Sequence, residues 1–197
     1  MSSKQSVPPG SPGFTLIEVM MVLAVLAMMV GLVIPTFNSM LQGQALSRQG
    51  EILNDQMNMA RQLATTRNRT IELRLVSRTN EGETRWATQI FESGQGASAA
   101  RPISRLERFA DGIVVNPSAD LSPMLGALDG GSADFSAFGQ SEYLALRFLP
   151  NGRLEKNFAT KKDYLTLQGR RDDLRNPINY FTIQVNPVTG RIGIYRP

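Results

Sequence analysis

The sequence predicts an α+β fold, in which one long N-terminal helix packs on a mostly antiparallel β-sheet domain. Two observations predict this fold. Apolar residues recur at helical spacing as far as about residue 67, and from about residue 70 the period changes to two. The chain has 197 residues, which leaves room for one soluble domain of ordinary size beside a membrane-length segment.

The first half of the predicted helix, residues 14–34, is apolar enough and long enough to cross a membrane. It would span about 30 Å, and Glu18 is its only charged residue. An ionised side chain at the centre of a bilayer helix costs about 2.5–3.5 kcal/mol on insertion scales, so Glu18 needs a compensating partner. A secretory signal peptide is disfavoured, because the apolar run is too long and no A-x-A-like site follows it.

The second half of the helix, residues 35–67, is predicted to be amphipathic. Its apolar stripe consists of Phe37, Leu41, Ala45, Leu46, Leu53, Met57, Ala60 and Ala64. The opposite face carries Gln42, Arg48, Asn54, Asp55 and Arg61. Pro35 removes one backbone hydrogen bond and crowds the carbonyl of Gly31, so we expect a kink between Gly31 and Pro35.

The remaining residues, 68–197, are predicted to form a β-rich domain. Alternating side chains indicate strands at 71–75, 86–91, 143–148, 163–168, 180–185 and 191–195. Proline and glycine indicate turns at 149–153 and 186–190. The stretch 93–142 has no clear period. Within it, Asp120 and the acidic segment 129–134 offer oxygen ligands for Ca²⁺, but the spacing is not that of an EF-hand and a solvated loop is the favoured interpretation.

Composition excludes several kinds of chemistry. The chain has no cysteine, so it has no thiol chemistry and no disulfide framework. It also has no histidine, the residue that most often serves as a general base. We therefore expect no catalytic residues, no metal site and no cofactor. The net charge of +4 is mild, and the basic residues are interspersed with acidic ones, unlike the basic stripe of a dedicated nucleic-acid binder.

The run Gly13-Phe14-Thr15-Leu16-Ile17-Glu18, followed by the apolar stretch and Pro35, resembles the class III signal of type IV pilins and pseudopilins. The resemblance implies that residues 1–13 are a leader peptide. A prepilin peptidase in the membrane would cut between Gly13 and Phe14 and methylate the new amino group of Phe14. The leader departs from many relatives in having Lys4 as its only basic residue.

The same resemblance implies an assembly role for Glu18, which would pair with the Phe14 amine of a neighbouring subunit in a filament. Losing one partner of such a buried pair leaves the other charge buried and uncompensated, which costs free energy. The pair would therefore fix the register in which subunits stack. The alternative is a protonated Glu18 held against its own helix.

The turn segments 147–153 and 186–192 are similar to those of minor pseudopilins of the H type and of FimT-type minor pilins. Length and motif order also suggest the Verru_Chthon cassette protein D group. The resemblance implies a non-enzymatic minor subunit of a type II secretion or type IV pilus-like filament, anchored once in the inner membrane with a cytoplasmic N terminus and a periplasmic domain. Its partners would be the peptidase, other pilin or pseudopilin subunits, the inner-membrane assembly platform and membrane lipid.

A second function, DNA capture by a minor pilin, depends on five arginines near the C terminus. They are Arg170, Arg171, Arg175, Arg191 and Arg196. Asp172 and Asp173 interrupt this basic series, and arginines at hairpin ends are usually solvated, so DNA binding is the less favoured hypothesis.

Overall fold

The computed structural model describes residues 13–94, 99–135, 138–156, 158 and 162–196, and within α1 it leaves out the side chains of residues 30–41. The chain divides into two compact units, Met1–Leu41 and Gln42–Pro197. The expected kink between Gly31 and Pro35, and the stripe residues Phe37 and Leu41, lie outside the described side chains.

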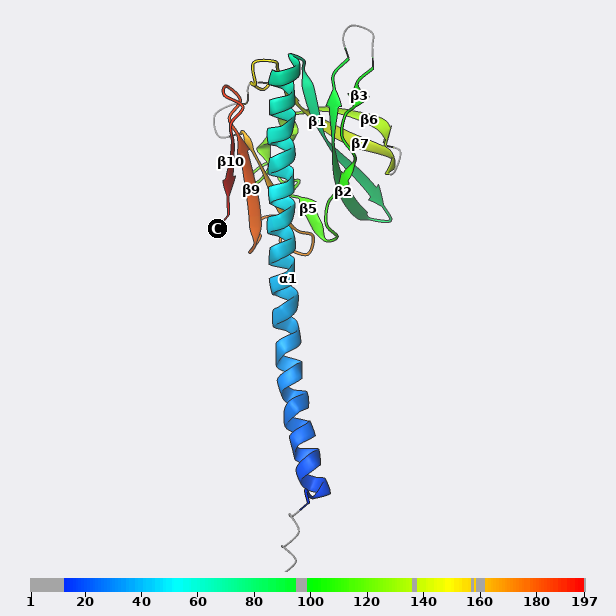
Figure 1. Cartoon of the computed structure of the whole chain (residues 1–197), viewed down its shortest axis with the longest axis vertical. Coiled ribbons are helices and arrows are strands. Elements are labelled where there is room, and N and C mark those ends of the chain that lie inside the picture. Colours follow the sequence, from blue (N-terminus) through cyan, green and yellow to red (C-terminus); the bar gives the residue numbers. More distant parts are fainter. Residues whose placement is uncertain (1–12, 95–98, 136–137, 157, 159–161, 197) are drawn as a thin grey trace, which may run out of the picture. The chain divides into compact units, whose positions relative to one another are not determined.

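One helix, α1, runs from Leu16 to Arg67 (Figure 1), so its ends lie within two residues of the predicted helix. In the unit Gln42–Pro197, its buried large apolar side chains and the alanines beside them are ones that the helical period selects. Leu46, Leu53, Met57, Ala60 and Ala64 are each at most 2% exposed. Helical spacing of three, four and seven places these side chains on one face, which is why one stripe can be covered by the sheets.

The strands form two antiparallel sheets. The first sheet has the order β3 (Arg101–Pro102), β2 (Glu83–Glu92), β1 (Ile71–Asn80), β7 (Gly139–Phe148) and β6 (Asp129–Phe135), and β4 (Glu107–Arg108) also pairs with β2. The second has the order β10 (Ile192–Tyr195), β9 (Tyr180–Val185), β8 (Tyr164–Gly169) and β5 (Ile113–Val115). A short 3₁₀ helix, η1, spans Pro123–Ala127. The α+β prediction is confirmed.

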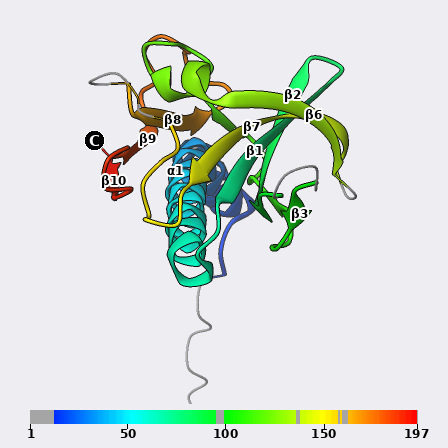
Figure 2. The same ribbon diagram turned by 90° about the horizontal axis from the view of Figure 1, so that it is seen from above.

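Both sheets lie against α1 and share one core with it (Figure 2). The stripe of α1 meets Leu73 and Leu146 of the first sheet and Leu167 and Ile183 of the second. Gly50 allows α1 to approach β9 closely, because a Cβ at this position would overlap the ring of Phe181. Burial of each large apolar side chain here is worth about 1.5–3 kcal/mol, so this shared core holds the helix to both sheets.

The other face of the first sheet has a smaller apolar cluster of its own. It consists of Val76, Ala87, Phe91, Phe135 and Phe138. The guanidinium of Arg74 lies over the rings of Phe91 and Tyr143, 4.0 and 4.3 Å from their centroids. Both faces of this sheet are therefore covered near its centre.

The interpretation of residues 129–134 as a solvated loop is wrong. These residues form most of β6, which pairs with β7 from Asp129↔Ala145 to Phe135↔Gly139. Glycine and aspartate are poor strand formers, so the local sequence gives no strand signal. The backbone hydrogen bonds to β7, a partner that follows in the chain, override that local preference.

Candidate functional site

The N-terminal motif lies at the start of α1, where Thr15 caps the helix. The backbone N–H and the hydroxyl of Thr15 both donate to Glu18 Oε2, each at 2.9 Å. In return, the Glu18 N–H donates to Thr15 Oγ1 at 3.3 Å. This is a capping box, in which two side chains satisfy backbone donors that the first helical turn leaves unpaired. The Thr-x-x-Glu spacing before an apolar run is a signal by which the sequence alone could have revealed it.

Because of the capping box, Glu18 does not depend on a neighbouring subunit for hydrogen-bond donors. In the single chain its carboxylate already accepts two hydrogen bonds, and its place in the first turn is favourable to the helix dipole. These contacts hold Glu18 against its own helix as an acceptor of hydrogen bonds. The protonated state that the alternative hypothesis assumes stays a prediction. Phe14 is 85% exposed, and its pairing with Glu18 of another subunit stays a prediction.

The described part of α1 before residue 30 presents an uncovered apolar surface. Its exposed large apolar residues are Leu16, Ile17, Val19, Met20, Met21, Val22, Leu23, Val25, Leu26, Met28 and Met29, and Phe14 just before the helix is exposed as well. Counting only residues that the structure describes, no helix combines the length and the hydropathy needed to cross a membrane.

The five C-terminal arginines do not form one patch. Arg191 and Arg196 flank opposite ends of β10, and Arg170 forms an ion pair with Glu83 of β2. Arg196 binds α1 instead, donating to the Gly43 carbonyl oxygen at 3.2 Å and to the Ser47 hydroxyl.

Arg171 and Arg175 are exposed on the loop between β8 and β9. The structure therefore distributes the five arginines over separate surroundings.

The two predicted turns, 149–153 and 186–190, pack on each other. Gly152 and Gly190 have φ values of 76° and 65°, which explains glycine at both positions. The Leu154 N–H donates to the Pro187 oxygen at 3.1 Å, and Arg153 Nε donates to the Val188 oxygen at 2.8 Å. The structure thus brings together the two segments that carry the resemblance to minor pseudopilins.

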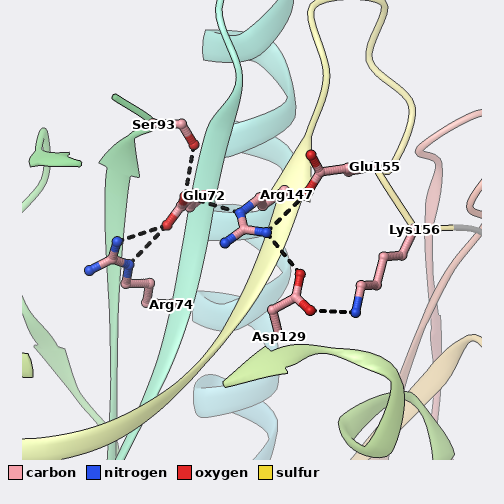
Figure 3. Close-up of polar contacts among 7 residues, drawn as sticks. All are labelled: Glu72, Arg74, Ser93, Asp129, Arg147, Glu155 and Lys156. Carbon is pink, nitrogen blue, oxygen red and sulfur yellow. Dashed lines mark hydrogen bonds and ion pairs between the residues drawn. The ribbon is translucent and has the colours of Figure 1, made fainter. Parts of the chain in front are cut away.

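A network of charged side chains crosses the first sheet at Glu72 (Figure 3). Glu72 is 5% exposed and lies directly opposite Arg147 in the β1–β7 register. Its carboxylate accepts from Arg147 Nε at 3.0 Å, from Arg74 Nη2 at 2.9 Å and from the Ser93 hydroxyl at 2.8 Å. Arg74 Nε also donates to it, at 3.0 Å, so three residues supply the donors of one buried carboxylate.

Arg147 continues the network outward. Its Nη1 lies 2.8 Å from Asp129 Oδ2 and 3.2 Å from Glu155 Oε2, and Lys156 Nζ lies 2.5 Å from the other oxygen of Asp129. The network thus contains three acidic and three basic side chains, so its charges sum to zero. Asp129, which the sequence offered as a Ca²⁺ ligand, has both oxygens engaged by cationic side chains.

The pKa values follow from these contacts. Burial alone would raise the pKa of Glu72, but hydrogen bonds from Ser93, Arg147 and Arg74 outweigh it and hold the pKa below the ordinary value of 4.5. The hydrogen bond from Lys156 is the main cause that lowers the pKa of Asp129. Ionised, mutually satisfied groups stabilise a sheet and are not poised to exchange protons, so we interpret this network as structural.

The network was not predicted from the sequence, because its central ion pair joins Glu72 and Arg147, which lie on strands far apart in the chain. One feature of the sequence could have indicated it. Glu72 and Arg74 alternate with the apolar residues of β1, so both side chains lie on the same face of that strand. Over the described ranges, no three acidic side chains gather closely enough to hold a metal ion.

Comparison with known proteins gives one family match. The family described as the prokaryotic N-terminal methylation motif matches residues 10–34, the segment that carries the prepilin signal. No curated protein matches the chain. Among solved structures, the type IV minor pilin FimU of Pseudomonas aeruginosa is similar at 18% identity, over 77% of this chain and 92% of that chain, with a TM-score of 0.41. The resemblance of the N terminus to the prepilin signal is confirmed by the family match.

Proposed function

We propose that this chain, whose N terminus carries the methylation signal of type IV pilin-like proteins, is a non-enzymatic minor subunit of a type II secretion or type IV pilus-like filament. The observation that carries the proposal is the match at residues 10–34. It coincides with the glycine, the aromatic residue and the glutamate that such processing and assembly require.

In this proposal, prepilin peptidase cuts between Gly13 and Phe14 and methylates the Phe14 amine. Cleavage leaves Thr15 and Glu18 in place, so the capping box can persist in the mature helix. Residues 14–34 then anchor the subunit in the inner membrane, with the unit Gln42–Pro197 on the periplasmic side. The uncovered apolar surface of α1 before residue 30 supports this anchor, because lipid or neighbouring helices would cover it.

Assembly would follow from the same helix. When subunits stack, the Phe14 amine of one chain and Glu18 of another would approach in a low-dielectric environment. A carboxylate has lone pairs beyond those that the Thr15 donors occupy, so Glu18 can keep its cap and still accept from an amine. The capping box would hold the carboxylate at a fixed position along the helix axis. A fixed carboxylate can define the axial register in which subunits stack.

The test of the proposal is the chemical state of the N terminus. Intact mass and N-terminal sequencing of the protein from cells with and without prepilin peptidase should show a chain that starts at methylated Phe14 only when the peptidase is present. A mature start at another residue, or a start that does not depend on the peptidase, would refute the proposal. Gly13→Val is expected to block cleavage, because it replaces the residue directly before the proposed cut.

A further inference from the structure

A cavity of about 600 Å³ lies where the two sheets meet. Strand β2 of the first sheet and strand β5 of the second lie side by side (Figure 1), and both contribute to its wall. The rest of the wall comes from the end of β1, from residues 108–111, from the turn between β6 and β7, and from Arg170 after β8. Ligand sites typically have volumes of about 300–1,000 Å³. We call this cavity the sheet-junction pocket.

Four arginines line the sheet-junction pocket, and two of them oppose each other directly. The four are Arg78, Arg85, Arg108 and Arg170. Arg78 on β1 and Arg85 on β2 are partners in the strand register, so their side chains lie on the same face of the sheet. Like charges at directly opposed positions destabilise a strand pair. An acidic ligand bound between the two strands would offset this repulsion.

The chain itself compensates these arginines only in part. The Glu83 carboxylate lies 3.3 Å from Arg85 and also pairs with Arg170, so two guanidinium groups share one carboxylate. Arg170 Nε is buried and has no hydrogen-bond partner. Arg78 Nη1 donates to the carbonyl oxygen of Phe138, and no carboxylate in the described part of the chain lies within ion-pair distance of Arg78. The pocket therefore has more guanidinium donors than the chain supplies acceptors.

Aromatic side chains form the apolar part of the pocket. Trp86 is half-buried, and Phe109 and Phe138 are buried. The guanidinium carbon of Arg108 lies 6.0 Å from the centre of the Phe138 ring, so basic and aromatic groups adjoin. Tryptophan and arginine together are enriched at the residues that contribute most to protein–protein binding.

We propose that the sheet-junction pocket binds an acidic peptide segment of a partner protein. A carboxylate of that segment would accept a bidentate pair of hydrogen bonds from Arg78, and a neighbouring apolar side chain would lie against Trp86. The lining favours a peptide over a nucleic acid, because Glu81, Glu83 and Asp111 also line the pocket and would repel a continuous series of phosphates. Four arginines and three carboxylates leave a net charge of +1, which matches a single carboxylate.

The inference goes beyond the proposed filament role, because it names a binding site and the chemistry of its ligand. It is independent of the processing of the N terminus, since every residue that lines the pocket belongs to the unit Gln42–Pro197.

The experiment titrates the full chain, in non-ionic detergent micelles, with a capped peptide that carries leucine–glutamate pairs in a glycine–serine background. The control peptide has glutamine in place of each glutamate. Trp86 is the only tryptophan of the chain and lines the pocket, so its fluorescence reports binding. The glutamate peptide should give a saturable change, and the glutamine peptide should bind about tenfold more weakly, as the loss of charge-assisted hydrogen bonds implies.

Three variants test the assignment of residues. Arg78→Gln should weaken binding of the glutamate peptide about tenfold. Arg101→Gln should leave it unchanged, because Arg101 is exposed and opposes Glu92, about 30 Å along β2 from Glu83. This control removes the same charge outside the pocket. Glu81→Gln should strengthen binding about twofold, because it removes a repulsive charge from the exposed rim. Misfolding does not produce such a gain in affinity.

Three results would overturn the inference. If neither peptide binds, or if both bind equally, the pocket does not recognise a carboxylate. If Arg78→Gln and Arg101→Gln weaken binding equally, only the overall charge of the chain attracts the peptide. If a single-stranded DNA oligonucleotide displaces the glutamate peptide and binds more tightly than it, the pocket serves nucleic acid. None of these results bears on cleavage before Phe14, so the proposed function is tested separately.

Discussion

Glu72→Gln is expected to destabilise the domain markedly, although the side chain keeps its size. Glu72 is 5% exposed and accepts from Arg147, Arg74 and Ser93. Removing one partner of a buried ion pair typically costs about 3–5 kcal/mol. Glutamine retains one acceptor oxygen, and Arg147 keeps its contacts with Asp129 and Glu155. We therefore expect a loss of about 2–3 kcal/mol, a large part of a stability of roughly 5–15 kcal/mol.

The assay is urea unfolding of the full chain in detergent micelles. Trp86 is the only tryptophan of the chain and packs against the main core, so its fluorescence reports on the domain. With a denaturant slope of about 2 kcal/mol per molar urea, the midpoint should fall by roughly 1 M. Glu83→Gln is the matched control, because Glu83 also pairs with arginines but its side chain is 48% exposed. Exposed pairs are worth about 0–1 kcal/mol, so its midpoint should change little.

The dependence on pH gives an independent check. The pKa of Glu72 is lowered in the folded protein, so its stabilisation is complete above the unfolded value of about 4.5 and is lost as the pH falls through the folded pKa. The difference in the free energy of unfolding between wild type and Glu72→Gln should therefore be largest near neutral pH and should decrease below pH 4.5. A gap that is equal at pH 7 and pH 3, or no larger than that of Glu83→Gln, would refute the assignment of Glu72 as an ionised centre of the network.

Three further predictions concern the helix and the turns. Glu18→Ala should leave membrane insertion intact and reduce crosslinking to filament subunits, and equal crosslinking would contradict the proposed charge pair. Gly190→Ala should lower the unfolding midpoint far more than Gly193→Ala, because its Cβ would overlap a backbone oxygen of the facing turn at positive φ, whereas Gly193 has open space; similar midpoints would argue against that turn packing. A chain that starts near Phe37 should fold and melt cooperatively, whereas one that starts after Arg67 should aggregate, because it loses the helical side of the core; equal stability of the two would mean that the helix is a free stalk.

The sequence by itself determined the helix and most of the long strands. The period of 3.6 selected Leu53, Met57 and Ala60 as the buried face of α1, and the structure buries all three completely. The period of two located β9 with both of its ends correct. These features could be predicted because neighbouring residues in the chain decide them. The prepilin signal could be predicted for the same reason, since it is a contiguous motif that the family match then confirmed.

Tertiary structure decided what separate segments of the chain do together. Residues 129–134 have a local composition typical of a loop, and only pairing with β7 makes them a strand. Glu72 and Arg147 form an ion pair because β1 and β7 align them, and the residues around each give no indication of its partner. Arg196 was grouped with the other arginines by sequence, yet the sheet places it on the helix at Gly43. For the Glu72–Arg147 pair and for Arg196, the deciding free energy comes from a contact across the fold, and for β6 it comes from the next strand of its hairpin. The local pattern of each segment alone encodes neither kind of contact.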